Sequence, residues 1–457
     1  MPTTLNRVEK GVYLDSVALM RVSRRVAVLP GVEAASLMIG TPSNRELLKG
    51  AGLLAREGGL AGPNDLVIAV RASSEAVARV AIEDAVRFLS ERNTEGTASL
   101  PRARSLAGAL ELLPGANLAL ISVPGEFAAL EARKALERGL HALVFSDNVP
   151  LDDELALKRL ARSRGLLLMG PDCGTALIAG TPIAFANAVP RGEIGIVSAS
   201  GTGLQEVSCL VARLGGGVSH GIGVGGRDLD ARIGALGMLA AIDALEEDPA
   251  TRTIVLISKP PAPEVAKRVM DRVKAGSKRF VVCFLGESGG TLRDAAEQAV
   301  NAKISRWERP DLKKQTGKSV RGLYCGGTLC SEAKLIFAAQ GLKGHAFVDL
   351  GDDEYTRGRP HPMIEPELRN EHVAAALADP KVGVILLDVV LGFGSHQDPA
   401  GILVKSLNGK KIVIASVVGT EGDPQVFSRQ VAALRAAGVV VAPSNAHAAE
   451  LAATLVS

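Results

Sequence analysis

The stretch with the clearest chemical potential is 194–206, where an apolar segment leads into Ser200, Gly201, Thr202 and Gly203. An amphipathic segment follows, so the pattern predicts a buried strand, a tight glycine turn and a helix. The first N–H groups of such a helix have no partner within the helix, and they carry the positive end of its dipole. With the hydroxyl groups beside them, they favour a phosphate or another oxyanion. The ordinary alternative is a well-capped turn that binds no ligand.

A second group of polar side chains lies in the segment 352–362, which reads Asp-Asp-Glu-Tyr-Thr-Arg-Gly-Arg-Pro-His-Pro. Arg357 and Arg359 each carry a planar guanidinium that suits a carboxylate or a phosphate. His361 can orient a substrate or exchange a proton. The alternative is a structural salt-bridge network with the neighbouring acids.

Two further cations stand where predicted strands end. Lys259 directly follows a predicted buried strand and precedes two prolines, and Arg227 follows a pair of glycines. Ligands of parallel sheets bind at the carboxyl ends of strands, so both residues are candidate oxyanion-binding groups. The alternatives are a solvated loop lysine and a salt-bridged arginine.

Alternating strand and helix patterns predict the elements that would position these residues. The first is a small βαβ-type module with strands at 8–14, 32–39 and 65–70 and helices at 16–29, 43–54 and 74–89. After a polar linker, the second is a Rossmann-like parallel sheet with strands at 116–123, 142–145 and 166–169 and helices at 128–138 and 151–164. No G-x-G-x-x-G fingerprint occurs, so nothing indicates a nicotinamide cofactor.

From residue 192 onward the sequence repeats itself. A shift of 126 residues superposes Gly201, Thr202 and Glu206 on Gly327, Thr328 and Glu332. We therefore predict two copies of one open α/β unit at 192–300 and 320–457, joined by the polar segment 301–319. If the copies pack about a pseudo-twofold axis, two helix N-termini can face one anion. With an α/β module at 1–95 and a Rossmann-like domain at 103–191, the predicted fold is α/β throughout.

Composition excludes several classes of protein. The net charge is +3 and no basic stripe interleaved with aromatic residues occurs, so no nucleic-acid partner is expected. No run of about 20 apolar residues and no signal-peptide pattern occurs, so we expect no membrane partner. The five cysteines lack a CxxC spacing, which argues against zinc and favours a reduced, cytoplasmic protein.

Several motifs resemble the α subunit of succinyl-CoA synthetase, namely Val123-Pro-Gly-Glu-Phe127, Gly170-Pro-Asp-Cys-Gly174 and the stretch 195–202. The segment 320–457 is similar to the carboxy-terminal domain of that enzyme's β subunit. More closely, nearly the whole chain resembles the FdrA family, and Gly358-Arg-Pro-His-Pro-Met-Ile364 is particularly specific. The resemblance implies several Rossmann-like and flavodoxin-like parallel-sheet domains, with a CoA-binding-type domain at 103–191.

The same resemblance implies a phosphate site between two helices. Carried over by position, its residues are Ser200, Gly201 and Thr202 from the first copy and Gly392 and Gly394 from the second. Glu206 matches the glutamate that steadies a phosphorylated histidine in the ligase. We therefore take Arg359, His361 and Glu206 as candidate catalytic residues, and Gly203, Gly327, Thr328, Lys259, Arg227 and Arg357 as further binding candidates.

The departures from the ligase pattern change the expected reaction. No histidine lies between His220 and His345, so the ligase's phosphorelay is missing, and the chain has no room for an ATP-grasp domain. FdrA-like proteins are linked to allantoin catabolism, in which oxalurate and phosphate give oxamate and carbamoyl phosphate. The resemblance thus implies a carbamoyltransferase subunit that binds a small anionic substrate, with phosphate or carbamoyl phosphate as ligand.

Two alternatives stay open. One is an acyl-CoA synthetase subunit that binds CoA and needs a separate ATP-grasp chain, although the ligase's first glycine-rich CoA loop has no counterpart before Ala116. The other is a non-catalytic scaffold or regulatory subunit. All three interpretations predict companion subunits and are compatible with a homo-oligomer.

Overall fold

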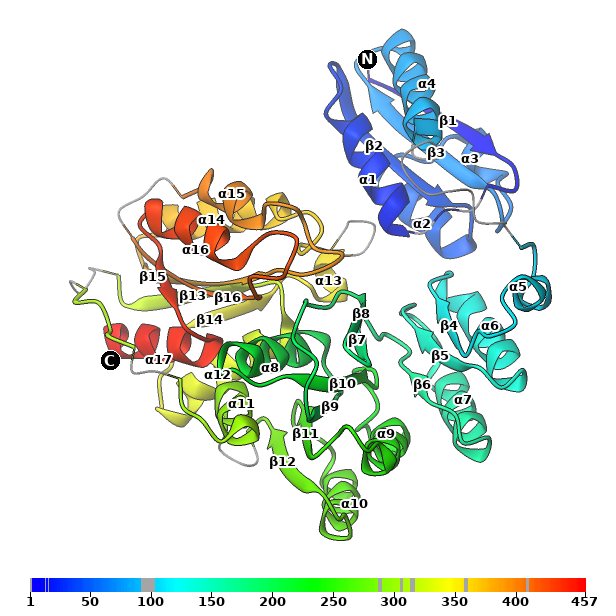
Figure 1. The fold of residues 1–457 in the computed structure, drawn as a ribbon. Coiled ribbons are helices and arrows are strands. Elements are labelled where there is room, and N and C mark those ends of the chain that lie inside the picture. The colour runs from blue at the N-terminus through cyan, green and yellow to red at the C-terminus, as the bar shows by residue number, and fades with distance from the viewer. Residues whose placement is uncertain are drawn as a thin grey trace. The chain divides into compact units, whose positions relative to one another are not determined.

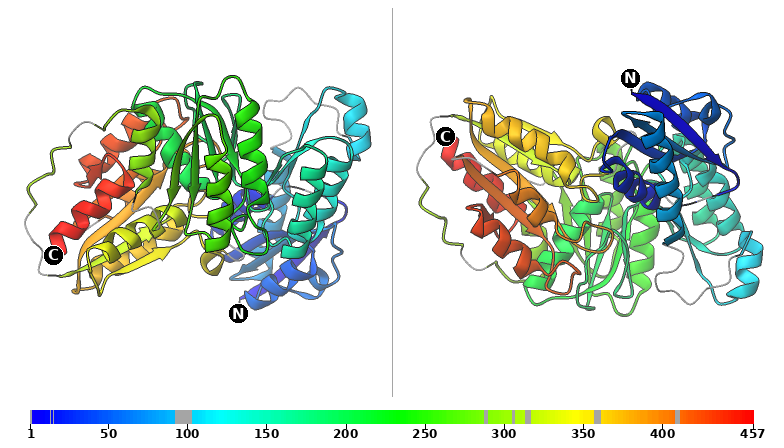
Figure 2. Two further views of the ribbon diagram at one scale, coloured as in Figure 1. Left: turned by 90° about the horizontal axis from the view of Figure 1, so that it is seen from below. Right: turned by 90° about the horizontal axis from the view of Figure 1, so that it is seen from above.

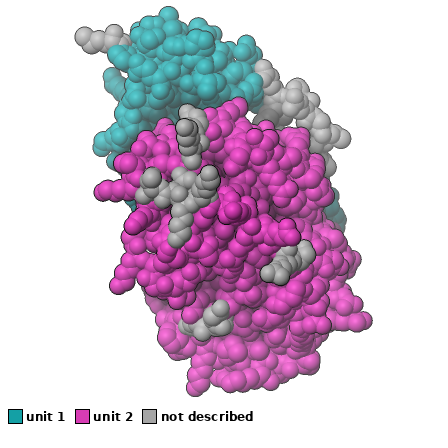
Figure 3. Space-filling model, turned by 90° about the vertical axis from the view of Figure 1, so that its left-hand side faces the viewer, with its two compact units in different colours: residues 1–114, 353–360 teal, residues 115–352, 361–457 magenta. Residues whose placement is uncertain are grey.

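The computed structural model describes residues 2–12, 14, 16–91, 103–286, 290–304, 307–312, 317–356, 361–407 and 411–457. The chain forms two compact units, one of residues 1–114 and 353–360 and one of residues 115–352 and 361–457 (Figure 3). Within the described ranges, none of the helices is both long enough and apolar enough to cross a bilayer.

The first unit is built on a three-stranded sheet. Its elements are β1 (Thr3–Glu9), α1 (Ser16–Ala27), β2 (Val32–Ile39), α2 (Pro42–Gly50), α3 (Arg56–Gly59), β3 (Leu66–Ala72), α4 (Glu75–Glu91), α5 (Leu106–Leu112) and α13 (Asp353–Thr356). The strand order is β1-β3-β2, and β3 runs antiparallel to both neighbours. The simple βαβ arrangement expected here was therefore wrong, because the third strand inserts between the first two in the opposite direction.

Burial on both faces explains the central place of β3. Ile68 and Val70 pack into the core under α1 and α4, while Val67 and Ala69 pack with Leu48 of α2. A strand that is apolar on both faces needs cover on both sides, and β3 has it from α1 and α4 on one face and α2 on the other.

The second unit begins with a parallel three-stranded sheet, as predicted. Its elements are β4 (Leu118–Ile121), α6 (Gly125–Glu137), β5 (His141–Val144), α7 (Leu151–Ser163) and β6 (Leu168–Met169), in the order β4-β5-β6. An unpredicted hairpin of β7 (Thr175–Ile178) and β8 (Thr181–Ala184) follows. Positive φ angles of 50° at Ala179 and 81° at Gly180 form its two-residue turn. The hairpin joins the next sheet through β7, which pairs with β10.

The remaining chain forms two larger sheets. The first copy contains β9 (Ile194–Ser198), α8 (Gly201–Arg213), β10 (Val218–Gly223), α9 (Leu236–Glu247), β11 (Thr253–Ser258), α10 (Pro263–Lys274), β12 (Arg279–Phe284) and α11 (Leu292–Val300). The second contains β13 (Ser319–Tyr324), α12 (Gly327–Ala339), β14 (Ala346–Asp349), α14 (Glu367–Ala378), β15 (Val382–Val390), α15 (Pro399–Val404), β16 (Ile412–Val418), α16 (Phe427–Ala436), β17 (Val440–Ala442) and α17 (Asn445–Val456).

The strand orders confirm the duplication. The first sheet contains β10-β9-β11-β12 as neighbours and the second contains β14-β13-β15-β16, followed by β17. Counted from the first strand of each copy, both follow the flavodoxin-like order 2-1-3-4. Helices α8, α11, α12 and α17 pack together where the two copies meet (Figures 1 and 2). Leu204 of α8 and Phe337 of α12 belong to one continuous apolar core, so the copies are not independent domains.

Candidate functional site

The turn from β9 into α8 is held by serine hydroxyl groups. The N–H of Ser200 donates to Ser198 Oγ at 3.1 Å, and Ser200 Oγ accepts from the N–H of Gly203 at 2.9 Å. Ser200 is therefore the N-cap of α8. An added Cβ at Gly201 would lie 2.9 Å from Thr175 Oγ1, so the β7 hairpin approaches this turn closely. The strand, turn and helix predicted for this stretch are confirmed.

The corresponding turn into α12 is held differently. Gly326 provides no side-chain cap, and the carboxylate of Asp388 on β15 instead accepts from the N–H groups of Cys325 and Gly326, both at 2.8 Å. Arg369 Nη1 donates to Asp388 Oδ1 at 3.1 Å, and both side chains are buried. A buried ion pair thus fixes the backbone from which α12 starts.

The two helix starts meet. Ser200 Oγ and Thr328 Oγ1 lie 2.5 Å apart and share a hydrogen bond. An added Cβ at Gly326 would lie 3.0 Å from both Oγ1 and Cγ2 of Thr202, so this side chain packs on the second turn. We call Ser200, Thr202, Gly326, Gly327 and Thr328 the helix-start site.

Two charged residues flank Gly327 in this site. An added Cβ there would lie 2.3 Å from Asp349 Oδ2 and 3.4 Å from Lys259 Nζ. Lys259 follows β11 and is exposed, whereas Asp349 ends β14 and is partly buried. Burial raises the pKa of Asp349 to about 6, against the opposing effects of the Gly351 N–H and Lys259. The carboxyl ends of β9, β11, β13 and β14 therefore converge on one polar cluster, where α/β sheets bind ligands.

His361 lies beside this cluster. An added Cβ at Gly351 would lie 2.4 Å from His361 Nε2, and Gly351 donates its N–H to Asp349 Oδ1 at 3.0 Å. Burial lowers the pKa of His361 to about 4, so its imidazole is neutral near pH 7. Its Nδ1 accepts from the N–H of Met363 at 3.2 Å, which leaves Nε2 to carry the proton. Arg357 and Arg359 lie outside the described residues.

Glu206 and Glu332 each cap a helix of the opposite copy. Glu206 Oε1 accepts from the N–H of Asn445 at the start of α17, at 3.0 Å. Glu332 Oε1 accepts from the N–H of Leu292 at the start of α11, at 2.7 Å. Asn445 Nδ2 also donates to Glu332 Oε2 at 2.7 Å, which joins the two carboxyl groups through one asparagine. Burial raises the pKa of both carboxyl groups, for Glu332 to about 7.

Three other predicted residues, Gly392, Gly394 and Arg227, make contacts with other parts of the chain. The N–H of Gly392 donates to Gln425 Oε1 at 3.0 Å, and added Cβ atoms at Gly392 and Gly394 would meet Ala186 O at 2.5 Å and the Phe185 ring at 2.8 Å. This glycine loop is thus bonded to the segment after β8. The third residue is Arg227.

Arg227 forms a salt bridge, which was the alternative to binding an oxyanion. Its Nη2 donates to Val149 O at 2.8 Å and lies 2.8 Å from Glu154 Oε2. Glu154 also pairs with Lys158 at 3.3 Å, and Lys158 with Asp228 at 2.5 Å. Since these last three side chains are buried, the network joins α7 to the next sheet.

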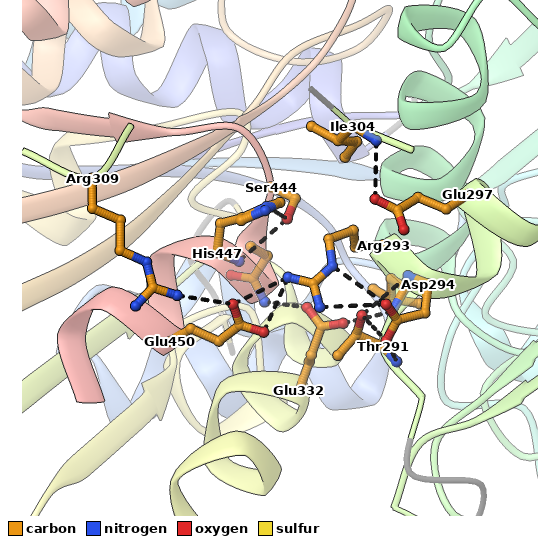
Figure 4. Close-up of polar contacts among 12 residues, drawn as sticks. Thr291, Arg293, Asp294, Glu297, Ile304, Arg309, Glu332, Ser444, His447 and Glu450 are labelled. Carbon is orange, nitrogen blue, oxygen red and sulfur yellow. Dashed lines mark hydrogen bonds and ion pairs between the residues drawn. The ribbon is translucent and has the colours of Figure 1, made fainter. Parts of the chain in front are cut away.

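The loop after β12 is the place where the ligase pattern has its histidine. Here it leads to Thr291, which forms a capping box with Asp294 at the start of α11. Figure 4 shows Arg293 reaching from α11 to Glu450 of α17, at 3.0 Å, with Asp294 on its other side. Trp307 packs edge-on against His447 of the same helix, so this tryptophan anchors the 301–319 segment there. Ion pairs and packing between the copies thus hold α11 and the linker against α17.

Asp349 and Asp388 are the polar residues that the sequence did not single out. Asp349 is an acid on the last residue of a strand, followed by Gly351, and that position is the signal that could have identified it. Asp388 lies within an otherwise apolar strand, where a lone buried acid indicates a structural partner.

Comparison with known proteins gives two family matches. A CoA-ligase model matches residues 323–455, and a model described as AllF, heavy metal-associated domain, matches residues 1–103. The chain is 41% identical over 503 residues to the uncharacterized protein YahF of Escherichia coli (strain K12), covering 97% of each chain.

More distant relatives match only part of the chain. It is 30% identical to subunit alpha 2 of a succinate–CoA ligase [ADP-forming] of Archaeoglobus fulgidus over 148 residues, or 32% of this chain and 50% of that subunit. A solved dinucleotide-forming acetyl-coenzyme A synthetase of Ca. Korarchaeum cryptofilum aligns over 74% of this chain and 82% of that one, at 19% identity and a TM-score of 0.31.

The name of the family that matches the N-terminal unit implies a bound metal, but the side chains of this unit do not suit a metal site. Residues 1–103 contain neither cysteine nor histidine, which soft and borderline metal ions prefer. The Asp65 carboxyl group instead accepts the N–H groups of Gly11 and Gly62 at 3.2 and 2.9 Å. We assign no chemistry to a metal in this unit.

Proposed function

We propose a phosphate-dependent carbamoyltransferase role for this chain, which belongs to the FdrA family. The reaction would convert oxalurate and phosphate to oxamate and carbamoyl phosphate, in a complex with companion subunits. The observation that carries the proposal is the meeting of two helix starts at Ser200 and Thr328, beside Lys259, in a chain without a histidine relay.

The geometry suits the chemistry of such a transfer. Phosphate carries its charge on several oxygens, and two helix N-termini with hydroxyl groups and a lysine offer several donors to them at once. The carbamoyl group passes directly between phosphate and nitrogen, so no phosphorylated side chain is needed. The protein then contributes positioning and electrostatic stabilisation. The five cysteines are all free and buried, which supports a site of action in the reducing cytoplasm.

The test is a reconstitution. The full chain is co-expressed with the products of its neighbouring genes, and release of carbamoyl phosphate from oxalurate is measured with and without inorganic phosphate. We expect release that depends on phosphate and that falls at least tenfold in a Gly327→Val variant, because a larger side chain would enter the helix-start site. No turnover in any combination of subunits would reject the proposal.

A second candidate function rests on the CoA-ligase match over residues 323–455 and on the succinate–CoA ligase relatives. In that case the chain would bind CoA and act with a separate ATP-grasp chain. One feature of the ligase pattern is missing here. The parallel sheet of β4, β5 and β6 has three strands, and among the described residues 103–117 no glycine-rich CoA loop precedes β4. Calorimetric titration with CoA separates the two candidates, since the carbamoyltransferase proposal predicts no heat of binding.

A further inference from the structure

The carboxyl group of Asp349 is placed to act on a ligand of the helix-start site. One of its oxygens, Oδ1, is fixed by the N–H of Gly351 at 3.0 Å. The other, Oδ2, lies over Gly327, where an added Cβ would be only 2.3 Å away. Asp349 is only partly buried, and this second oxygen lies at Gly327, the first helical residue of α12.

The two copies differ at this position. The shift of 126 residues places Gly223, the last residue of β10, on Asp349, the last residue of β14. An added Cβ at Gly223 would lie 2.5 Å from Thr175 O and 2.6 Å from Cys173 Sγ, so no side chain fits there. At this position only the second copy thus supplies an acid to the paired helix starts.

The proposed transfer must move one proton. A phosphate oxygen attacks the carbamoyl carbon of oxalurate, the carbon–nitrogen bond breaks, and the nitrogen takes the electron pair. Monohydrogen phosphate loses its proton and the nitrogen of oxamate gains one, so the reaction is balanced without an external acid or base. An amide nitrogen is a poor leaving group unless it is protonated as it departs, so a group that carries this proton accelerates the step.

We propose that Asp349 is the catalytic residue that carries this proton, accepting it from phosphate on Oδ2 and delivering it to the departing nitrogen. This inference rests on the proposed carbamoyltransferase function. It assigns Asp349 a chemical task that differs from those of the N-cap hydroxyl group and Lys259, which serve as hydrogen-bond donors to the phosphate oxygens.

The charges around Asp349 are consistent with this task. Lys259 faces it from the end of β11, Asp388 from β15, Asp352 from its own loop, and neutral His361 lies behind Gly351. Burial and the two acids raise the pKa of Asp349 to about 6, and Lys259 opposes them. A carboxyl group with a pKa near the working pH can both accept and return a proton.

The test compares Asp349→Asn with Asp230→Asn in the co-expressed complex. Asp230 makes the same local bond, since its Oδ1 accepts an N–H from two residues along the chain, from Arg232 at 2.8 Å, outside the helix-start site. We expect D349N to lower kcat at least 100-fold and to leave the Kd for inorganic phosphate within about threefold, whereas D230N changes neither. Asp349→Glu should recover part of the loss, because it restores the carboxyl group.

The pH profile separates a chemical role from a structural one. The wild-type rate should change through a limb near pH 6 that D349N lacks, while the ionisation of phosphate affects both proteins alike. Turnover of D349N within threefold of wild type, with the same profile, would overturn the Asp349 inference alone. A loss of phosphate binding as large as the loss of kcat would also overturn it in favour of a structural role. An inactive wild-type complex would overturn the carbamoyltransferase proposal and this inference together.

Discussion

Replacing Ser200 by alanine removes two hydrogen bonds that define the helix-start site. One is the N-cap bond from the N–H of Gly203 at 2.9 Å, and the other joins Thr328 Oγ1 at 2.5 Å. Loss of an N-cap costs about 1 kcal/mol, and loss of a neutral hydrogen bond costs about 1 kcal/mol. We expect S200A to lower the free energy of unfolding by about 2 kcal/mol.

A double-mutant cycle isolates the bond between the copies. Thr328→Val removes that bond but keeps the shape of the side chain, so it should cost about 1 kcal/mol. The bond can be lost only once, so S200A with T328V should cost about 2 kcal/mol rather than about 3. Urea unfolding followed by fluorescence of the single tryptophan, Trp307, which packs against α17, measures all four proteins. Strictly additive losses of unfolding free energy would refute the hydrogen bond between the Ser200 and Thr328 hydroxyl groups.

Ligand binding needs a control that loses a comparable cap. Ser444 caps α17 by accepting from the N–H of His447 at 3.3 Å, and it contacts His447 Nδ1 at 2.8 Å. Ser444→Ala should therefore destabilise the fold about as much as S200A. Calorimetry should show a Kd for inorganic phosphate about tenfold higher in S200A than in wild type or S444A. Equal weakening in both variants would mean that phosphate does not bind at the helix-start site.

Three further predictions concern charged groups. Lys259→Met should raise the Kd for inorganic phosphate about fivefold, and calorimetry at rising salt should reduce this difference, because Lys259 is exposed. Lys158→Met should lower the free energy of unfolding by about 3–5 kcal/mol, since it removes the ion pair of the buried Asp228 carboxyl group. In the same urea assay Lys134→Met should cost under about 1 kcal/mol, because the Lys134 side chain is 41% exposed. The free energy of unfolding should also fall as pH rises from about 4.5 to about 7, because Glu332 binds its proton more tightly in the folded than in the unfolded protein. Glu332→Gln should make this dependence on pH shallower.

These three predictions have distinct contrary outcomes. A salt-independent effect of K259M would place Lys259 outside the anion site. Equal costs for K158M and K134M would mean that water reaches the network beside α7. An unchanged slope of unfolding free energy against pH in E332Q would show that Glu332 does not titrate in the folded protein over this range.

The sequence predicted most elements and the duplication, because these depend on local periodicity. The strand 32–39 was predicted at the bounds that β2 has, and the shift of 126 residues predicted two sheets of one strand order. Strand direction in the first unit was not predictable in the same way. Periodicity gives the residues of a strand but not its partner, so the antiparallel insertion of β3 required knowledge of what covers both of its faces.

The candidate site shows the same division. The repeat paired the helix starts that carry Ser200 and Thr328, and Lys259 was a candidate because it directly follows a strand. The reciprocal contacts of Glu206 and Glu332 depend on how one copy packs on the other, which no local pattern reports. Glu206 was a catalytic candidate because it matches a glutamate of the ligase, and in the structure its carboxyl group caps α17.

The exchange of caps between the copies has a consequence for how such a chain is assembled. Without the second copy, the buried Glu206 would face water and its copy would lose the carboxylate that caps α11; without the first, α17 would lose its cap. Each half is thus an incomplete folding unit whose missing part is supplied by the other, as in an obligate heterodimer. The covalent connection through 301–319 guarantees equal numbers of both halves. Cleaving this connection should leave two fragments that remain associated as long as they are folded.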